Sequence, residues 1–127
     1  MKKIKVAING FGRIGRITFR QIQKNRNIEV VAVNDLTDTD NLAHLLRYDS
    51  VHRRFDGTVE VDGDEIKVNG KRIAVLSEPD PSRLPWKELG IDIVLESTGK
   101  FVTRKDALRH VNDSGARKVI ISAPAKA

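Results

Sequence analysis

Near the start of the chain, four of the five residues 4–8 are apolar, with Lys5 between them, a pattern typical of a buried strand. From residue 13 to about residue 24 the apolar positions recur at the spacing of one helix face, and residues 28–34 are again rich in β-branched side chains. The first 35 residues therefore predict a strand, a helix and a second, parallel strand. Another helix is expected to follow the Thr- and Asp-rich residues 37–40 and to run to about Arg47.

Each of these two helices has one apolar face. Its residues are Ile14, Ile17, Thr18 and Ile22 in the first helix and Leu42, Leu45 and Leu46 in the second. Helices that are apolar on one side pack on the face of a sheet, so these two segments favour a layered α/β protein.

Residues 55–77 show a different pattern, in which apolar and polar residues alternate. Asp62-Gly63 and Asn69-Gly70 interrupt the alternation, and both dipeptides are typical of two-residue hairpin turns, whose residues must tolerate positive φ. The expected strands are residues 58–61, 66–68 and 72–76. We interpret this segment as a small antiparallel excursion whose last strand returns to the parallel core.

The rest of the chain alternates between helix and strand again, after an irregular connection that three prolines between residues 79 and 85 predict. The expected elements are a helical turn at residues 86–90, strands at 91–96 and 118–122, and a helix at 103–114 with Thr103 and Asp106 at capping-box spacing. This order predicts a Rossmann-type doubly wound fold. Its sheet should be mainly parallel with a small antiparallel hairpin excursion, in one domain spanning residues 1–127.

Gly10, Gly12 and Gly15 stand between the first strand and the first helix at the spacing G-x-G-x-x-G. In dinucleotide-binding proteins these glycines allow a tight turn, a close approach of the backbone to a pyrophosphate, and close packing of helix on strand. The helix that begins near Arg13 would direct its free N–H groups at the same pyrophosphate. A glycine turn that only bends the chain is the alternative interpretation.

An acidic residue at the end of the second strand is the further feature expected of a dinucleotide site, because it binds the ribose hydroxyls. Asp35 ends the β-branched run about 20 residues after Gly15. The alternative is that Asp35 only caps the turn before Thr37. Since the motif lies between a strand and a helix, we expect the dinucleotide site.

The chain carries a net charge of +6, which raises the possibility of nucleic-acid binding. Its cations are scattered and mixed with 17 acidic residues, so a solvated basic surface is the preferred interpretation. Such a surface would also attract an anionic dinucleotide or a phosphorylated substrate.

The sequence contains no cysteine, which excludes a disulfide, a thiolate metal site and a cysteine nucleophile within this chain. His44, His52 and His110 are expected to be structural or solvent-facing. No apolar stretch reaches membrane-spanning length and no signal-peptide pattern opens the chain, so we expect a cytoplasmic protein without membrane contact.

Five motifs occur in series along the chain: residues 9–16 (NGFGRIGR), 33–35 (VND), 48–52 (YDSVH), 96–99 (ESTG) and 118–126 (KVIISAPAK). In this order and spacing they resemble the phosphorylating glyceraldehyde-3-phosphate dehydrogenase family, and the resemblance covers the whole chain. It implies the NAD-binding domain of a homotetrameric glycolytic oxidoreductase that oxidises and phosphorylates glyceraldehyde 3-phosphate.

The resemblance also implies which residues bind the cofactor. Arg13 and Ile14 would contact the pyrophosphate through backbone N–H groups, Asp35 would bind the adenosine ribose, and the Pro79 carbonyl would face the adenine. Ser97, Thr98 and Gly99 would line the nicotinamide-side ribose, with Phe101 and Ser122 bordering the pocket. The full set of predicted cofactor-binding residues is Asn9, Gly10, Gly12, Arg13, Ile14, Gly15, Asn34, Asp35, Pro79, Ser97, Thr98, Gly99, Phe101 and Ser122.

NAD is expected rather than NADP, because the Asp35 carboxylate would repel a 2′-phosphate and leave it unpaired. Leu36 fits the pattern of NAD-using members of the family. Arg is frequent in the family where this chain has Pro79, and glycine is frequent where it has Arg53.

The family's reaction needs a cysteine thiolate, and the sequence ends before the family's Ser-Cys-Thr-Thr-Asn stretch and catalytic domain. We therefore expect cofactor binding without catalysis by this chain alone. A sheet of order 3-2-1-4-5-6 would also lack its last strand, which would leave residues 118–122 as an apolar edge that drives self-association.

Three functions fit these sequence features. The first is a stand-alone NAD-binding module, and the second is a part of the oxidoreductase that becomes active only with the missing catalytic half. The third, from another class, is a basic nucleic-acid-binding module. We prefer the first.

Overall fold

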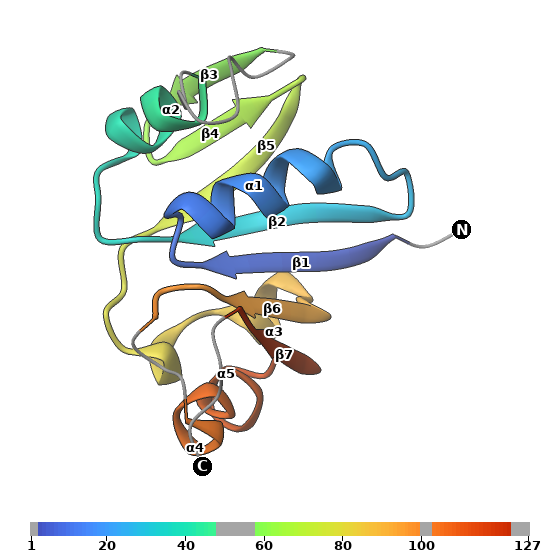
Figure 1. Cartoon of the computed structure of the whole chain (residues 1–127), viewed down its shortest axis with the longest axis vertical. Helices are drawn as coiled ribbons and strands as arrows, with labels where there is room; N and C mark the ends of the chain where they lie inside the picture. The colour runs from blue at the N-terminus through green and yellow to red at the C-terminus, as the bar shows by residue number, and fades with distance from the viewer. Residues whose placement is uncertain (1–2, 48–57, 100–102, 123–127) are drawn as a thin grey trace.

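A computed structural model describes residues 3–47, 58–99 and 103–122, and the statements below concern these residues. In chain order the elements are β1 (Ile4–Asn9), α1 (Arg13–Ile22), β2 (Ile28–Asn34), α2 (Thr39–Arg47), β3 (Val59–Asp62), β4 (Glu65–Val68), β5 (Lys71–Leu76), the 3₁₀ turn η1 (Pro81–Arg83), α3 (Trp86–Leu89), β6 (Ile93–Glu96), α4 (Arg104–Ala107), α5 (Arg109–Asn112) and β7 (Lys118–Ile121). Figure 1 shows them along the chain.

The described strands form one sheet in the order β3-β4-β5-β2-β1-β6-β7. Strands β5, β2, β1, β6 and β7 are parallel neighbours, whereas β3-β4 and β4-β5 are antiparallel pairs. The predicted fold class is therefore confirmed, including the hairpin excursion and the return of its last strand to the parallel core. The strand order of the parallel part also agrees with the expected 3-2-1-4-5 arrangement.

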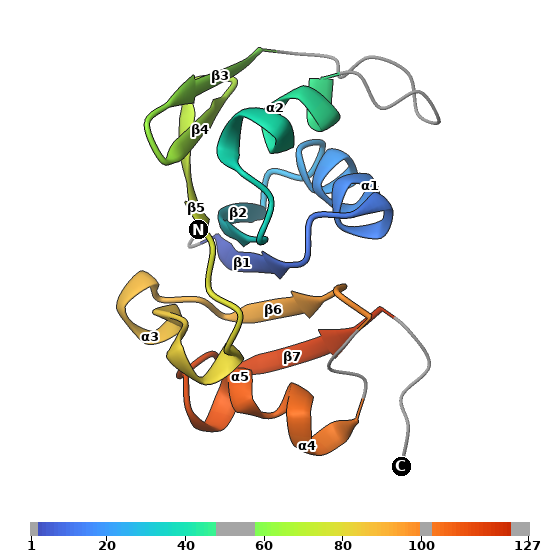
Figure 2. The ribbon, with the colours of Figure 1, turned by 90° about the vertical axis from the view of Figure 1, so that its left-hand side faces the viewer.

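Helices cover both faces of this sheet, as a doubly wound fold requires. Figure 2 shows α1 and α2 on one face and α3 on the other. Val6 and Ile8 of β1 belong to the core under α1 and α2, and Ala7 belongs to the second core around Trp86. Successive side chains of a strand point to opposite faces, so β1 contributes to both cores.

The apolar faces of the first two helices were predicted only in part. Ile14 is 49% exposed and Leu45 is 38% exposed, while Phe19, which was not assigned to the face, is buried. The rotation of α1 follows from Gly15, because a Cβ on Gly15 would lie 2.5 Å from the Gly10 carbonyl oxygen. Gly15 and Phe19 lie one helical turn apart and therefore on the same face of α1, which points inward. Ile14 is not on this face and points away from the sheet.

Three local expectations differ from the structure. The helix expected over residues 103–114 is divided at Leu108 into α4 and α5, and His110 of α5 is buried. The first hairpin turn is Gly63-Asp64 rather than Asp62-Gly63, because Asp62 still pairs with Glu65. The turn η1 was not predicted; the Asp80 side chain caps it by accepting the Ser82 N–H at 3.0 Å.

Candidate functional site

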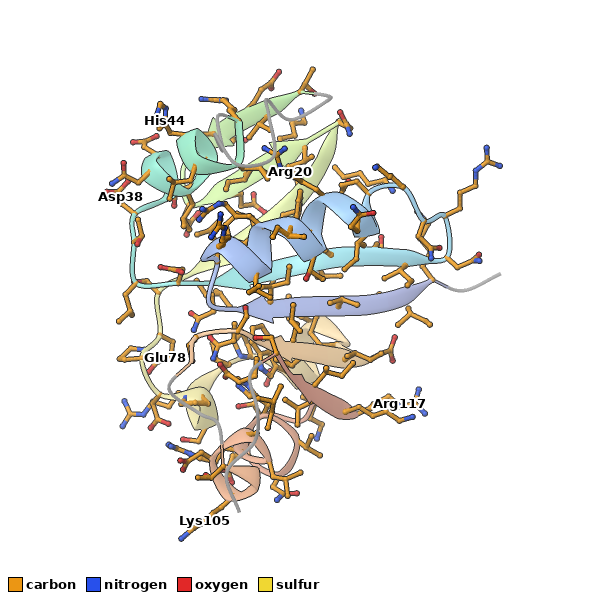
Figure 3. The ribbon with its side chains drawn as sticks, viewed as in Figure 1. Arg20, Asp38, His44, Glu78, Lys105 and Arg117 are labelled. Atoms are coloured by element: carbon orange, nitrogen blue, oxygen red, sulfur yellow. The ribbon has the colours of Figure 1, made fainter. Side chains whose placement is uncertain are left out.

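The carboxyl ends of three parallel strands bring polar residues together at the middle of the sheet. Asn9 at the end of β1 is paired in register with Asn34 of β2 on one side and with Glu96 of β6 on the other. In Figure 3, Glu78 lies on the side toward which the arrows of β1 and β2 point, and Arg117 lies at the opposite end of the strands. Ligands of open α/β sheets bind at this carboxyl edge.

The glycine turn between β1 and α1 is shaped by two close backbone contacts. Gly10 has φ +93°, and a Cβ on it would come within 2.8 Å of the Thr98 Cα. Gly15 packs equally closely against the Gly10 carbonyl. A Cβ on Gly12, in contrast, would meet nothing within 4 Å, so the backbone at Gly12 faces open space.

The N-terminus of α1 begins at this open position. Gly12 is its N-cap residue, and the first turn of the helix contains no acidic side chain. The Arg16 N–H donates to the Gly12 carbonyl at 2.9 Å, so the N–H groups that precede Arg16 have no acceptor within the helix. The exposed end of the helix dipole and these N–H groups favour an anion.

Asp35 connects the glycine turn to the end of β2. Its Oδ2 accepts the Phe11 N–H at 2.7 Å, and its Oδ1 accepts the Thr37 N–H at 2.9 Å. Asp35 therefore caps the turn before Thr37, as one interpretation of the sequence expected. The same carboxylate also holds the glycine turn through Phe11. Each carboxylate oxygen can accept a further hydrogen bond, and the side chain is only half-buried.

The turn after β6, at residues 97–99, packs against the glycine turn. The Ser97 hydroxyl donates to the Gly10 carbonyl at 2.6 Å, and the Thr98 N–H and hydroxyl donate to Glu96 Oε2 at 3.0 and 2.6 Å. Gly99 has φ +76° and is exposed. Ser122, after β7, donates its N–H to the Glu96 carbonyl at 3.0 Å and lies beside this turn.

Asn9 and Asn34 are buried beneath the two turns, and their side chains bond to protein groups. Asn34 Nδ2 donates to Asn9 Oδ1 at 2.7 Å and to the Glu78 carbonyl at 2.8 Å, and Asn34 Oδ1 accepts the Glu78 N–H at 2.8 Å. Asn9 Nδ2 donates to Glu96 Oε1 at 2.7 Å. These two residues therefore support the site from below, and Asn34 fixes the segment that carries Pro79, which is exposed.

Glu96 and His110 form a buried pair that the sequence analysis did not identify as part of the site. Glu96 is 2% exposed and His110 is fully buried, and Glu96 Oε1 lies 2.7 Å from His110 Nε2. The Trp86 indole N–H donates to His110 Nδ1 at 2.9 Å. An indole nitrogen can only donate, so His110 Nδ1 accepts, the ring is neutral, and Nε2 carries the proton that binds Glu96.

The environment of Glu96 has opposing effects on its charge. Burial by itself would raise the pKa of the Glu96 carboxyl, but hydrogen bonds from His110, Thr98 and Asn9 outweigh burial and hold the pKa below its usual value. The carboxylate is therefore ionised at neutral pH. One feature of the sequence could have indicated the role of Glu96: it ends a buried strand. Burial of a carboxylate there costs free energy unless hydrogen-bond donors surround it.

The remaining predicted residues are distributed as follows. His110 is structural and His44 is exposed on α2, in agreement with the expectation for histidines, while His52 and Phe101 lie outside the described residues. Within residues 3–47, 58–99 and 103–122, no group of three or more His, Asp or Glu side chains could hold a metal ion. No helix in the same ranges is long and apolar enough to cross a membrane.

Comparison with known proteins gives a consistent result. The model of the family "Glyceraldehyde 3-phosphate dehydrogenase, NAD binding domain" matches residues 4–104. Glyceraldehyde-3-phosphate dehydrogenase of Geobacillus stearothermophilus is 63% identical over 123 residues, which are 97% of this chain and 36% of that protein. The enzymes of Thermotoga maritima and Escherichia coli K12 are 61% and 55% identical over 96% and 97% of this chain. The chain spans little more than a third of the length of these relatives.

Proposed function

Because the chain belongs to the glyceraldehyde-3-phosphate dehydrogenase family, of which it is the NAD-binding domain, we propose that it binds NAD across the carboxyl ends of β2, β1 and β6. The observation that carries this placement is the hydrogen bond from the Phe11 N–H to Asp35. It brings the predicted phosphate-binding turn and the predicted ribose-binding carboxylate into direct contact.

The pyrophosphate lies over Gly12 at the start of α1. The open space above Gly12 supports this position, since a Cβ there would occupy space that the phosphate oxygens need. The backbone N–H groups of Arg13 and Ile14 lie in the first helical turn, where they have no acceptor within the helix. The exposed Arg13 side chain adds positive charge nearby.

The adenosine half lies along the end of β2, with its ribose hydroxyls on Asp35 and its adenine near the Pro79 carbonyl. Leu36 is 57% exposed and Ile14 is 49% exposed, and each directly follows a proposed binding residue. Exposed apolar side chains beside a polar site are typical of a surface that receives a ring system. The Asp35 carboxylate makes NAD the preferred cofactor over NADP.

The nicotinamide half lies toward the turn at residues 97–99, with Ser122 beside it; the role that the resemblance implies for Phe101 concerns a residue outside the described ranges. The hydroxyls of Ser97 and Thr98 donate to protein groups. These two residues would therefore contribute to cofactor binding through the shape of the turn and through their backbone groups. The exposed Gly99 leaves room for the ribose. NAD, when bound, supplies the hydride acceptor, and the chain's own residues bind and orient it.

At the level of the whole protein, we propose a role in the glycolytic oxidation and phosphorylation of glyceraldehyde 3-phosphate, in the cytoplasm and in a homo-oligomer. This chain contains no cysteine, so it supplies the cofactor site and no thiolate, and we expect no turnover from it alone. A catalytic domain added in trans would test whether activity returns. Neither the family nor the relatives point to nucleic acid.

Calorimetric titration with NAD and NADP tests the proposed site. We expect Asp35→Asn to weaken NAD binding by about tenfold and to narrow the preference for NAD over NADP, since a charged hydrogen-bond acceptor is lost. Asp38→Asn is the matched control, because Asp38 is exposed and caps α2 by accepting the Asn41 N–H at 2.8 Å. Equal affinities of the two variants for NAD would contradict the proposed role of Asp35.

A further inference from the structure

We propose that Glu96 is a positioning residue of the NAD site: its buried carboxylate collects four hydrogen-bond donors and so holds the turn at residues 97–99 in place. The proposal rests on the proposed function, because this turn is the proposed contact for the nicotinamide half. Glu96 itself is 2% exposed and lies beneath the turn, so it would act on the cofactor only through other residues.

All four partners of the carboxylate are donors. Oε1 accepts from Asn9 Nδ2 and His110 Nε2, both at 2.7 Å, and Oε2 accepts from the Thr98 N–H at 3.0 Å and the Thr98 hydroxyl at 2.6 Å. An ionised carboxylate has acceptor capacity for four donors and no proton of its own. A glutamine of the same shape would direct its amide NH₂ either at two donors, Asn9 Nδ2 and His110 Nε2, or at the Thr98 backbone N–H, because only the Thr98 hydroxyl could turn to accept it.

The donor directions are fixed from outside this group. The Glu78 backbone N–H can only donate, and it bonds to Asn34 Oδ1, so Asn34 Nδ2 must point to Asn9 Oδ1. Asn9 Nδ2 is thereby directed at Glu96. On the other side, the Trp86 indole N–H fixes His110 as the tautomer with its proton on Nε2. Neither series of hydrogen bonds, Glu78–Asn34–Asn9 or Trp86–His110, can reverse its donors and acceptors. Asn9 and His110 therefore cannot accept a hydrogen bond from a donor placed where the carboxylate is.

This arrangement serves the site because the held turn also shapes the glycine turn. The Thr98 backbone leaves no room for a side chain on Gly10, because a Cβ there would be only 2.7 Å from the Thr98 nitrogen. The Ser97 hydroxyl also donates to the Gly10 carbonyl. Release of Thr98 from Glu96 would loosen the nicotinamide side first. The adenosine side depends on Asp35 and the N-terminus of α1, which Glu96 does not touch.

The test compares NAD with AMP, which carries only the adenosine half. In the 127-residue chain we expect Glu96→Gln to weaken NAD binding by about tenfold and AMP binding by less than about twofold, since charged hydrogen bonds to the turn are lost. Ile66→Ala, in the buried part of the hairpin, is the control for destabilisation alone and should leave the ratio of NAD to AMP affinity unchanged.

A rescue experiment separates positioning from general destabilisation. Trp86→Phe removes the indole donor, so His110 is free to carry its proton on Nδ1 and to accept the introduced amide at Nε2. The carbonyl oxygen of the introduced amide would then face Thr98. We expect Trp86→Phe combined with Glu96→Gln to recover part of the NAD-to-AMP ratio lost in Glu96→Gln, while Trp86→Phe alone leaves the ratio near that of the wild type.

Thr98→Val decides the outcome if Glu96→Gln does not fold. It removes one donor to Oε2 and keeps the backbone N–H, so we expect a loss of about threefold for NAD and none for AMP. A ratio unchanged in every folded variant would overturn the role of Glu96 while leaving NAD binding intact. Failure of the wild-type chain to bind either ligand would instead overturn the proposed function and this proposal together.

Discussion

At the scale of residues, the three glycines of the turn have different steric surroundings, although the sequence presents them as one motif. Gly10 has positive φ and no space for a side chain, and Gly15 is pressed against the Gly10 carbonyl. Gly12 has φ −80° and open space around it. Folding therefore requires Gly10 and Gly15, whereas only a ligand would require Gly12.

Alanine substitutions should separate these roles. We expect Gly12→Ala to change the free energy of unfolding by less than about 1 kcal/mol and to weaken NAD binding at least tenfold, because its Cβ would fill the phosphate position. Gly10→Ala should destabilise the fold by at least about 2 kcal/mol through strain and overlap with Thr98. Urea unfolding and NAD titration measure the two effects. A Gly12→Ala variant with wild-type affinity would show that the phosphate lies elsewhere.

Glu96 should make stability depend on pH in the acid range. Its pKa in the folded state lies below its ordinary value of 4.5, so its stabilising contribution is complete above about pH 4.5 and is lost as the pH falls through the lower folded value. We expect the free energy of unfolding to fall more steeply below pH 4.5 in the wild type than in Glu96→Gln. Asp80, whose pKa is lowered by Ser82, contributes to both curves, so their difference isolates Glu96. Parallel curves would contradict this assignment.

At the scale of elements, the sequence located both hairpin turns, the first of them displaced by one residue, but it assigned the helix faces only in part. Asn69-Gly70 forms the predicted turn, with φ of +51° and +84°, because this dipeptide tolerates positive φ wherever it stands. The face of α1 was misjudged because its rotation is set by the contact of Gly15 with the Gly10 carbonyl. That contact arises only when the helix is folded back on the strand.

The second hairpin turn permits a test of local conformation. We expect Asn69→Ala to lower the free energy of unfolding by about 1 kcal/mol more than Asn69→Gly does, since glycine adopts positive φ without strain. Both variants lose the hydrogen bond from the Thr58 N–H to Asn69 Oδ1, so the comparison removes that contribution. Chemical denaturation gives the two values. Equal stabilities would mean that the positive φ at Asn69 costs alanine nothing.

At the scale of the whole molecule, β7 is the end strand of the described sheet. It pairs with β6 on one side, and Ile120 on it is 54% exposed. An apolar end strand is a template for pairing with a second chain. We propose that the chain self-associates through this edge, and the exposed Ile120 supports the proposal.

Light scattering over a range of concentrations tests the association. We expect Ile120→Lys to shift the chain toward the monomer, because a charge on an end strand opposes pairing. Ile4→Lys is the matched control, since Ile4 is 41% exposed but lies on β1, between β2 and β6. A wild-type chain that remains monomeric at high concentration, or an equal effect of both variants, would exclude β7 as the contact.

The order of strands and helices, the hairpin excursion and the glycine turn could all be predicted from the sequence. Each depends on residues close together in the chain, whose periodicity and conformational limits are local properties. The cofactor and the family were also accessible, because the motifs occur in series along the whole chain.

Only the tertiary structure decided which groups support the site. Asn9, Glu96 and His110 are separated by up to 101 residues, yet they form one buried hydrogen-bonded group with Trp86. Helical spacing could not show that His110 turns inward, or that the Asn9 and Asn34 side chains bond to each other. A buried polar group is stable only when donors and acceptors match in space, and that match exists only after strands distant in sequence have been brought side by side.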